Sequence, residues 1–281
     1  MSHAAEQRDD RPRPDLTGAP NVIEVKKLVT HYGAREILHK IDFSVREGEI
    51  MVIMGGSGSG KSTLLNTLLG LLRPTSGTVQ ILGEDLTKIS DVQRTLLRRK
   101  IGVAFQGGAL FGSLNVLENI MLPLREHTKL DVNTMRIMAR LKMQVVNLAG
   151  FEHLNPSELS GGMIKRAAFA RAVVMDPKIL FCDEPSAGLD PIVAAAIDEL
   201  ILNLRDAMGM SVVVVTHELE SAFRIADRIC VLDKGDILMT GTVNEIRSST
   251  NERIQNLLNR RTETEVLDPE EYLKRLTAAN D

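Results

Sequence analysis

The fold is decided by Gly55-Gly56-Ser57-Gly58-Ser59-Gly60-Lys61-Ser62-Thr63, which matches the pattern G-x-x-x-x-G-K-[ST] at every fixed position. The apolar run Ile50-Met51-Val52-Ile53-Met54 precedes it and predicts a buried strand. Leucines at helical spacing follow and predict a helix. A loop of this kind can wrap its backbone around phosphates, and the N–H groups at the helix start point towards the anion. The leucines that predict the helix after the loop are Leu64, Leu65, Leu68, Leu69 and Leu72.

Two side chains of this loop have the chemistry that a nucleoside triphosphate requires. Lys61 is placed for the β- and γ-phosphates, and the Ser62 hydroxyl is placed for Mg²⁺. An ordinary glycine-rich turn is the alternative, and it is disfavoured because the flanking strand and helix also agree. The remaining loop residues expected against the phosphates are Gly55, Gly56, Ser57, Gly58, Ser59, Gly60 and Thr63.

The amino-acid composition indicates which broad class of protein this chain belongs to. Apolar residues make up 43% of the 281 and charged residues 25%, as in a soluble globular protein. A net charge of −3 and the absence of Trp argue against a nucleic-acid partner. Cys182 and Cys230 lie in apolar runs, which predicts buried thiols in a reducing compartment. No apolar run approaches the roughly 18 residues of a membrane span, so we expect a cytosolic protein whose membrane role comes through a partner.

The hydrophobic pattern divides the chain into three parts. Residues 1–20 are polar and Pro-rich, which predicts a disordered segment. Strands alternate with helices over residues 21–243, which predicts a largely parallel α/β sheet with a small antiparallel layer. Within it, a Met-rich stretch at about 107–175 predicts an inserted helical subdomain. Residues 244–281 predict a C-terminal helical extension.

That extension is expected to contain two short amphipathic helices. Ile254, Leu257 and Leu258 fall at helical spacing, and Asp268-Pro269-Glu270-Glu271 has the composition of a second helix start. Helices this short do not persist alone in water, so each needs a surface to pack on. That surface is either the chain's own domain or, for the second helix, a neighbouring subunit or an accessory protein.

Two acidic residues end another apolar strand. Asp183 and Glu184 follow Ile179-Leu180-Phe181-Cys182 directly. Carboxylates at the C-terminal edge of a parallel sheet lie beside the phosphate loop. Asp183 is therefore the candidate Mg²⁺ ligand, and Glu184 is the candidate that orients or deprotonates the attacking water.

A second anion site is indicated by Leu159-Ser160-Gly161-Gly162-Met163. Ser160 has the chemistry to cap the following helix, and the two glycines expose amides at its start. One chain with one triphosphate needs only one such site. This second site is therefore predicted to serve the nucleotide bound to another copy of the chain.

In this order, the motifs make the chain resemble an ATP-binding-cassette (ABC) ATPase subunit over about residues 22–241. The resemblance implies an α/β, RecA-like P-loop fold of the ABC type, with an antiparallel β layer and an inserted helical subdomain. It implies ATP and Mg²⁺ as cofactors. It also implies a head-to-tail dimer with two ATPs between the copies.

The family pattern implies roles for matching positions. Tyr32, in the expected loop Thr30-His31-Tyr32-Gly33, matches the aromatic residue that stacks on adenine. Gln106 matches the glutamine that touches Mg²⁺ and water and links to the transmembrane partner, and His217 matches the switch histidine that contacts the γ-phosphate. Met163 stands where the family commonly has glutamine. Positions matching those that face the partner's nucleotide or the dimer interface are Ser160, Gly161, Gly162 and Asp190.

A narrower resemblance is to the ATPase of Mce/Mla-type lipid transporters. It is carried by residues 106–114, 119–127, 161–168 and 188–192. It implies lipid or phospholipid transport across the bacterial envelope, on the cytoplasmic face of the inner membrane. The implied partners are permease subunits, an Mce-domain lipid-binding protein and a small accessory protein.

Three other functions stay open at this point. The chain could serve an amino-acid or methionine importer, against which Gly107-Gly108-Ala109-Leu110-Phe111 and Met163 argue. It could be a soluble ABC protein of translation or DNA repair, but it shows neither a second cassette nor a long coiled-coil insertion. It could be a phosphate-loop kinase or GTPase, in which case residues 159–163 would be a coincidence.

Overall fold

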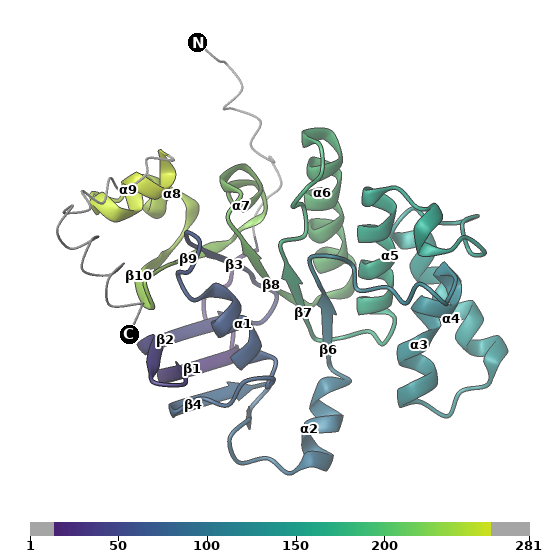
Figure 1. Ribbon diagram of the computed structural model, residues 1–281, viewed down its shortest axis with the longest axis horizontal. Helices are drawn as coiled ribbons and strands as arrows, with labels where there is room; N and C mark the ends of the chain where they lie inside the picture. The colour runs from purple at the N-terminus through teal and green to yellow at the C-terminus, as the bar shows by residue number, and fades with distance from the viewer. Residues whose placement is uncertain (1–13, 260–281) are drawn as a thin grey trace, which may run out of the picture.

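The computed structural model describes residues 14–259, and its central feature is a mostly parallel six-stranded sheet (Figure 1). Its strands are β3 (Ile50–Met54), β6 (Ile101–Ala104), β7 (Ile179–Asp183), β8 (Ser211–Thr216), β9 (Arg228–Asp233) and β10 (Asp236–Gly241). The order is β10-β9-β3-β8-β7-β6, and β10 alone runs antiparallel to its neighbour. The predicted largely parallel α/β sheet is confirmed.

Strand β3 shows why the central strands read as unbroken apolar runs. Ile50, Val52 and Met54 face one hydrophobic core, whereas Met51 and Ile53 face a second core on the other side of the sheet. Successive side chains of a strand point to opposite faces, so a sheet covered on both faces requires apolar residues at every position. All five side chains are fully buried.

The second sheet is antiparallel and confirms the predicted β layer. Its strands are β1 (Asn21–Tyr32), β2 (Arg35–Arg46), β4 (Ser76–Ile81) and β5 (Glu84–Asp85), in the order β2-β1-β4-β5. The placement of Tyr32 in a loop is wrong, because Tyr32 pairs with Arg35 at the end of β1. An irregularity near Lys27, whose φ is +49°, interrupts the alternation and hides the continuity of the strand in the sequence.

Helix α1 (Lys61–Leu68) follows the phosphate loop, as predicted, but it is shorter than the leucine spacing suggests. The chain leaves the helix at Leu69, and Gly70 has a φ of +65°, a conformation that ends helices. Leu72 therefore lies beyond the helix.

The helices between β6 and β7 form a separate group at one end of the molecule (Figure 1). α3 (Val116–His127), α4 (Val132–Val145) and α5 (Gly161–Val173) fall within the predicted helical insertion, with a short 3₁₀ turn at Pro156–Glu158. The remaining helices are α2 (Asp91–Arg98), α6 (Pro191–Met208), α7 (Leu219–Ile225), α8 (Val243–Arg247) and α9 (Glu252–Leu258).

The first predicted helix of the extension is present as α9 and packs on the chain's own core. Ile254 is fully buried, and Leu257 and Leu258 are partly buried against the same cluster. Ile246 of α8 is fully buried beside them. The second predicted helix, which starts at residue 268, lies outside the described residues, and so does most of the segment 1–20.

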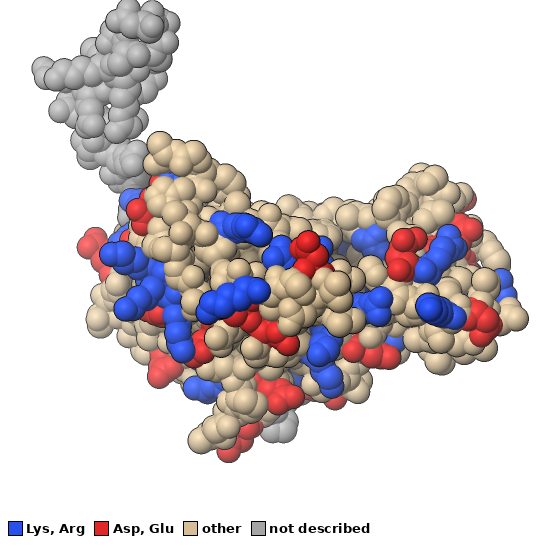
Figure 2. All heavy atoms as spheres, turned by 90° about the horizontal axis from the view of Figure 1, so that it is seen from below, with Lys and Arg blue, Asp and Glu red and all other residues tan. Residues whose placement is uncertain are grey.

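The surface seen in Figure 2 mixes Lys and Arg with Asp and Glu, as the small net charge leads one to expect. Within residues 14–259, no helix combines the length and the apolar character needed to cross a membrane. Cys182 and Cys230 are buried and unbonded, as predicted. Burial raises the pKa of the Cys230 thiol to about 12, so this thiol stays protonated.

Candidate functional site

The phosphate loop joins β3 to α1 in a shape that requires glycine at two of its positions. A Cβ on Gly55 would lie 2.1 Å from the carbonyl oxygen of Leu232, a separation that no real side chain tolerates. Gly60, the N-cap of α1, has a φ of +108°, in the region that favours glycine. The loop is thus held tightly against β9 and leads directly into the N-terminus of α1, where the first N–H groups have no partner within the helix.

Lys61 points back over this loop. Its Nζ donates hydrogen bonds to the carbonyl oxygens of Gly55, at 2.9 Å, and Gly56, at 2.8 Å. Burial lowers the pKa of the Lys61 ammonium, and the neighbouring charges of Glu184 and Asp183 oppose that shift. The ammonium therefore lies at the mouth of the loop, where an incoming phosphate would replace the two carbonyls.

A cavity of about 770 Å³ lies beside the loop. The loop forms one wall, and the ends of β7 and β8 with the segment after β6 form another, at the carboxyl edge of the sheet where ligands of α/β proteins bind. The structure therefore brings the predicted catalytic and metal-binding side chains together. The predicted residues that line the cavity are Gly55, Gly56, Ser57, Gly58, Lys61, Ser62, Gln106, Asp183, Glu184 and His217.

Glu184 is held in a defined orientation. One carboxylate oxygen, Oε1, lies 2.7 Å from Nδ1 of His217, and the other, Oε2, accepts a hydrogen bond from the Thr216 hydroxyl at 3.0 Å. Its N–H donates to the carbonyl of Val215 at 2.8 Å. The φ of Glu184 is +46°, a strained conformation that persists only where the surroundings impose it. Strand β8 thus fixes both the backbone and the carboxylate of the candidate base.

Asp183 is suited to hold a cation. Burial raises the pKa of its carboxyl, the adjacent Glu184 raises it further, and Lys165 and Lys61 oppose both effects. A divalent cation at this point would favour the ionised carboxylate. The Ser62 hydroxyl and the Gln106 amide line the same cavity, and such oxygen donors are the ligands that Mg²⁺ prefers.

Lys165 is a site residue that sequence reasoning missed. It lies on α5 with only 7% of its surface exposed. Its Nζ donates to the carbonyl oxygen of Glu184 at 3.0 Å and also to the carbonyl oxygen of Gln106. Burial lowers the pKa of this ammonium, and Glu184 and Asp183 oppose the shift. The sequence gives little signal, because Lys165 is one of three basic residues on this helix, beside Arg166 and Arg171.

Three further contributors were also missed. Thr216 is fully buried and positions Glu184, as described above. Asn256 and Leu257, from α9, line the cavity opposite the strand ends. No motif marks the α9 residues, because they reach the site only through the packing of the extension on the core.

The second anion motif lies away from this cavity. Ser160 caps α5 as predicted, with its Oγ accepting from the N–H of Met163 at 3.3 Å. Asp190 caps α6 by accepting from the N–H groups of Ile192 and Val193. Neither Ser160, Gly161, Gly162 nor Asp190 is among the residues lining the cavity of the same chain.

Four other predicted residues also do not line the cavity. Tyr32 is 51% exposed at the end of β1. Ser59 and Thr63 are buried within the loop and the first turn of α1, and Gly60 is the helix cap. The buried Oγ of Ser59 has no hydrogen-bond partner among residues 14–259. These loop residues therefore shape the loop and do not face the cavity.

Comparison with known proteins gives a consistent set of likenesses. A family model described as "ABC transporter" matches residues 38–187. The chain is 39% identical over 239 residues to the probable ribonucleotide transport ATP-binding protein mkl of Mycobacterium leprae, covering 85% of this chain and 69% of that protein. It is 38% identical over 238 residues to the intermembrane phospholipid transport system ATP-binding protein MlaF of Haemophilus influenzae, covering 85% and 90%. The MlaF of Escherichia coli K12 is 36% identical, covering 85% and 88%.

Solved structures of ATP-binding cassettes also superpose on the chain. An ATP-binding cassette solved as a dimer in a post-hydrolysis state, bound to ADP and Pi, superposes with a TM-score of 0.72 at 34% identity, covering 79% of this chain and 98% of that one. A Clostridium perfringens cassette of the cbiONQ ABC transporter complex superposes with a TM-score of 0.75 at 26% identity, covering 91% and 99%.

Proposed function

The chain belongs to the ABC transporter family of ATP-binding proteins, and from this premise we propose that its ATP hydrolysis drives phospholipid movement through a permease in the bacterial envelope. The observation that carries the ATPase chemistry is the convergence of Lys61, Asp183, Glu184 and His217 on one cavity. Membership of this family also removes the kinase and GTPase alternatives.

Each residue has a role that follows from its position. The loop amides and Lys61 bind the β- and γ-phosphates, while Asp183, Ser62 and Gln106 hold Mg²⁺, which when bound offsets charge on the phosphates. Glu184 orients water and accepts its proton, because its carboxylate is already fixed by the Thr216 hydroxyl and His217. His217, half exposed beside Glu184, is left to contact the γ-phosphate.

The second anion site acts in a dimer. Ser160, Gly161 and Gly162 lie at the start of α5, where N–H groups have no partner within the helix, yet they do not line their own chain's cavity. A head-to-tail pair would bring them to the partner's γ-phosphate, and Asp190 would lie at the interface. The similar cassette bound to ADP and Pi was solved as a dimer, which supports this arrangement. In it, Tyr32 is free to stack on adenine because its ring is exposed.

The proposed substrate is inferred from the relatives of the chain. The MlaF relatives are named for phospholipid transport, and the mkl relatives are named for ribonucleotide transport. The segments 106–114, 119–127, 161–168 and 188–192 favour the lipid class, since they resemble Mce/Mla-type ATPases. Importers of amino acids or methionine and soluble ABC proteins are the less favoured readings.

The implied partners define where the protein works. They are a second copy of the chain, permease subunits, an Mce-domain lipid-binding protein and a small accessory protein. The chain would then lie on the cytoplasmic face of the inner membrane, held there by its permease. Nucleic acid is not expected among its partners.

A purification from the native cell in mild detergent tests this proposal. Mass spectrometry of the bound proteins and lipids should find a permease with an Mce-domain protein and enriched phospholipid. After reconstitution, phospholipid should stimulate ATP hydrolysis and ribonucleotides should not. Co-purification with an amino-acid permease, or stimulation by ribonucleotides alone, would contradict the lipid assignment while leaving the ATPase intact.

A further inference from the structure

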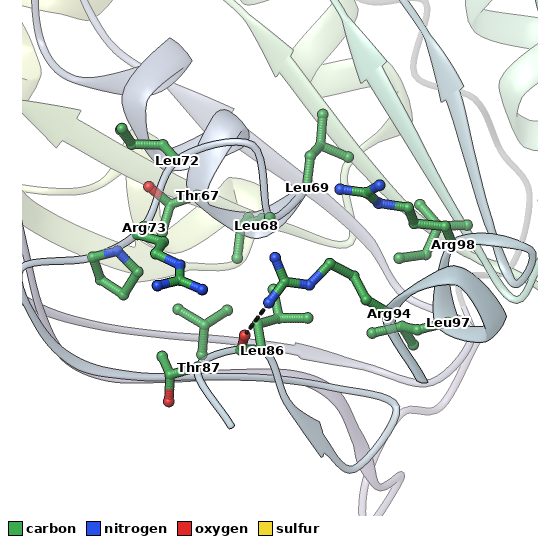
Figure 3. A pocket seen from close by; sticks show the side chains of 14 residues that line it. Thr67, Leu68, Leu69, Leu72, Arg73, Leu86, Thr87, Arg94, Leu97 and Arg98 are labelled. Carbon is green, nitrogen blue, oxygen red and sulfur yellow. Dashed lines mark hydrogen bonds between the residues drawn. The ribbon is translucent and has the colours of Figure 1, made fainter. Parts of the chain in front are cut away.

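A second cavity, of about 230 Å³, lies away from the nucleotide site (Figure 3). Its walls come from the end of α1 and the turn after it, from β4 and the segment after β5, and from α2. The floor is apolar and includes Leu68 and Leu97, which are buried, and Leu86. The cavity thus offers apolar surface to a ligand, and nothing in the ATPase chemistry uses it.

Arginine side chains enter this cavity from two sides. Arg73 comes from the turn after α1 and Arg94 from α2, and Figure 3 shows both guanidinium groups directed at the centre. Arg94 makes one long hydrogen bond, from Nη2 to the carbonyl of Leu86 at 3.5 Å, while its buried Nε has no hydrogen-bond partner among residues 14–259. A buried donor without a partner costs free energy, so this group calls for an acceptor.

The positive charge is not neutralised locally. Arg98, a third arginine, lines the same cavity, and none of the lining residues is acidic. In the part of the chain that the structure describes, Arg73, Arg94 and Arg98 form no ion pair. The nearby Asp85 forms an ion pair with Lys88 and accepts from the Thr87 hydroxyl, although its buried Oδ2 has no hydrogen-bond partner among residues 14–259.

We infer that this cavity binds an amphiphilic anion. A phosphate or carboxylate head sits between Arg73 and Arg94, whose planar forks match such groups in two-point hydrogen bonding. A single short apolar chain lies on the leucine floor. A volume of about 230 Å³ suits one short chain and does not hold both chains of a two-chain lipid.

The C-terminus of α1 repels an anion electrostatically, but this repulsion is small. A helix C-terminus carries about half a negative charge, whereas three guanidinium groups line the cavity. Three carbonyls in the last turn of α1 are also occupied. Leu65 and Thr67 accept from the N–H groups of Leu69 and Gly70, and Asn66 accepts from the turn that follows. The net field in the cavity therefore favours an anion.

Isothermal titration calorimetry with octyl phosphate tests the site. Saturating ADP and Mg²⁺ are present throughout, so that the phosphate loop is filled and cannot take the probe. The wild type should bind one octyl phosphate per chain, and Arg94→Gln should weaken that binding roughly ten- to a hundredfold. Arg99→Gln is the matched control, because this exposed arginine just beyond α2 loses the same charge without lining the cavity. It should bind as the wild type does.

Three results would overturn the inference. The first is that the wild type shows no saturable binding of octyl phosphate, and the second is that Arg94→Gln binds it as tightly as the wild type. The third is that inorganic phosphate or octanol, each of which lacks half of the proposed ligand, binds the wild type as tightly as octyl phosphate does. Arg73→Gln provides a second variant should Arg94→Gln unfold on heating at a lower temperature than the control.

Sedimentation with phosphatidylglycerol or phosphatidylcholine vesicles then identifies the source of the ligand. Arg94-dependent binding to the anionic vesicles indicates a membrane lipid tail or head, and octyl phosphate binding without vesicle binding indicates a free metabolite.

Discussion

Replacing Glu184 with Gln should separate ATP binding from ATP hydrolysis. The change removes the carboxylate that accepts a proton, but it preserves the size of the side chain. Gln retains an oxygen for the Thr216 hydroxyl and an amide group on the side of His217, so the strand-end geometry survives. The phosphate loop is untouched, because Lys61 is held by the carbonyls of Gly55 and Gly56.

The size of the effect follows from the loss of a positioned base. Such a loss costs roughly 10²–10⁴-fold in rate, or about 3–5 kcal/mol in activation free energy at 1.36 kcal/mol per decade. ATP affinity should change by less than about threefold, which is below 1 kcal/mol. With ATP bound and hydrolysis blocked, the dimer should accumulate in its closed form.

The hydrolysis rate is measured by steady-state phosphate release, and the ATP affinity by equilibrium binding. The accumulation of dimer is measured by size-exclusion chromatography with light scattering. Glu220→Gln is the matched control, since Glu220 is an exposed acid in the first turn of α7. It should hydrolyse ATP at nearly the wild-type rate. A Glu184→Gln protein that turns over within about threefold of the wild type would refute the assignment of Glu184 as the base.

Four shorter predictions follow from other contacts. Lys61→Ala should weaken ATP binding itself, and a titration with unchanged affinity would argue against the loop as the phosphate site. Cysteines placed at Ser57 and Gly161 should crosslink between chains when ATP is present, and crosslinks found only within one chain would reject the dimer arrangement. Lys165→Met should lower kcat by up to roughly 10²-fold with little change in KM, and Lys165→Arg should restore part of it, because small misplacements of catalytic groups are costly. Burial raises the pKa of Asp198 from 3.8 to about 6, so its stabilising contribution is full below pH ~4 and is lost as pH rises through 6. Asp198→Asn should therefore remove about 2 kcal/mol of the difference in unfolding free energy between pH 4.5 and 7.5, measured with urea, and an unchanged difference would contradict it.

The predicted catalytic side chains could be placed from the sequence because each lies at a strand end. In a parallel sheet, the carboxyl ends of the strands meet at one edge, so Asp183, Glu184 and His217 converge on the loop after β3 whatever the details of packing. The apolar runs that identify these strands are strong local signals. The fold class followed from the same signals, since the strands alternate with helices.

The parts that the sequence does not reveal depend on packing between distant segments. Lys165 contacts the carbonyls of Gln106 and Glu184, and a backbone carbonyl leaves no mark on residue type. The extent of β1 was obscured by the irregularity at Lys27, which breaks the period of two. The arginine-lined cavity was also hidden, because Arg73 and Arg94 belong to separate elements that only the fold brings together.

Helix α5 connects the two halves of the proposed mechanism. Its first residues carry the amides expected at the partner's nucleotide, and Lys165 follows Ser160 by about 7.5 Å along the same helix, at 1.5 Å per residue. Lys165 in turn binds the carbonyls of Gln106 and Glu184, which flank the chain's own cavity. Any shift of α5 that closes it on the partner must therefore move or strain the groups around the candidate base. In the proposed dimer, closure and readiness for hydrolysis would in this way be coupled through Lys165.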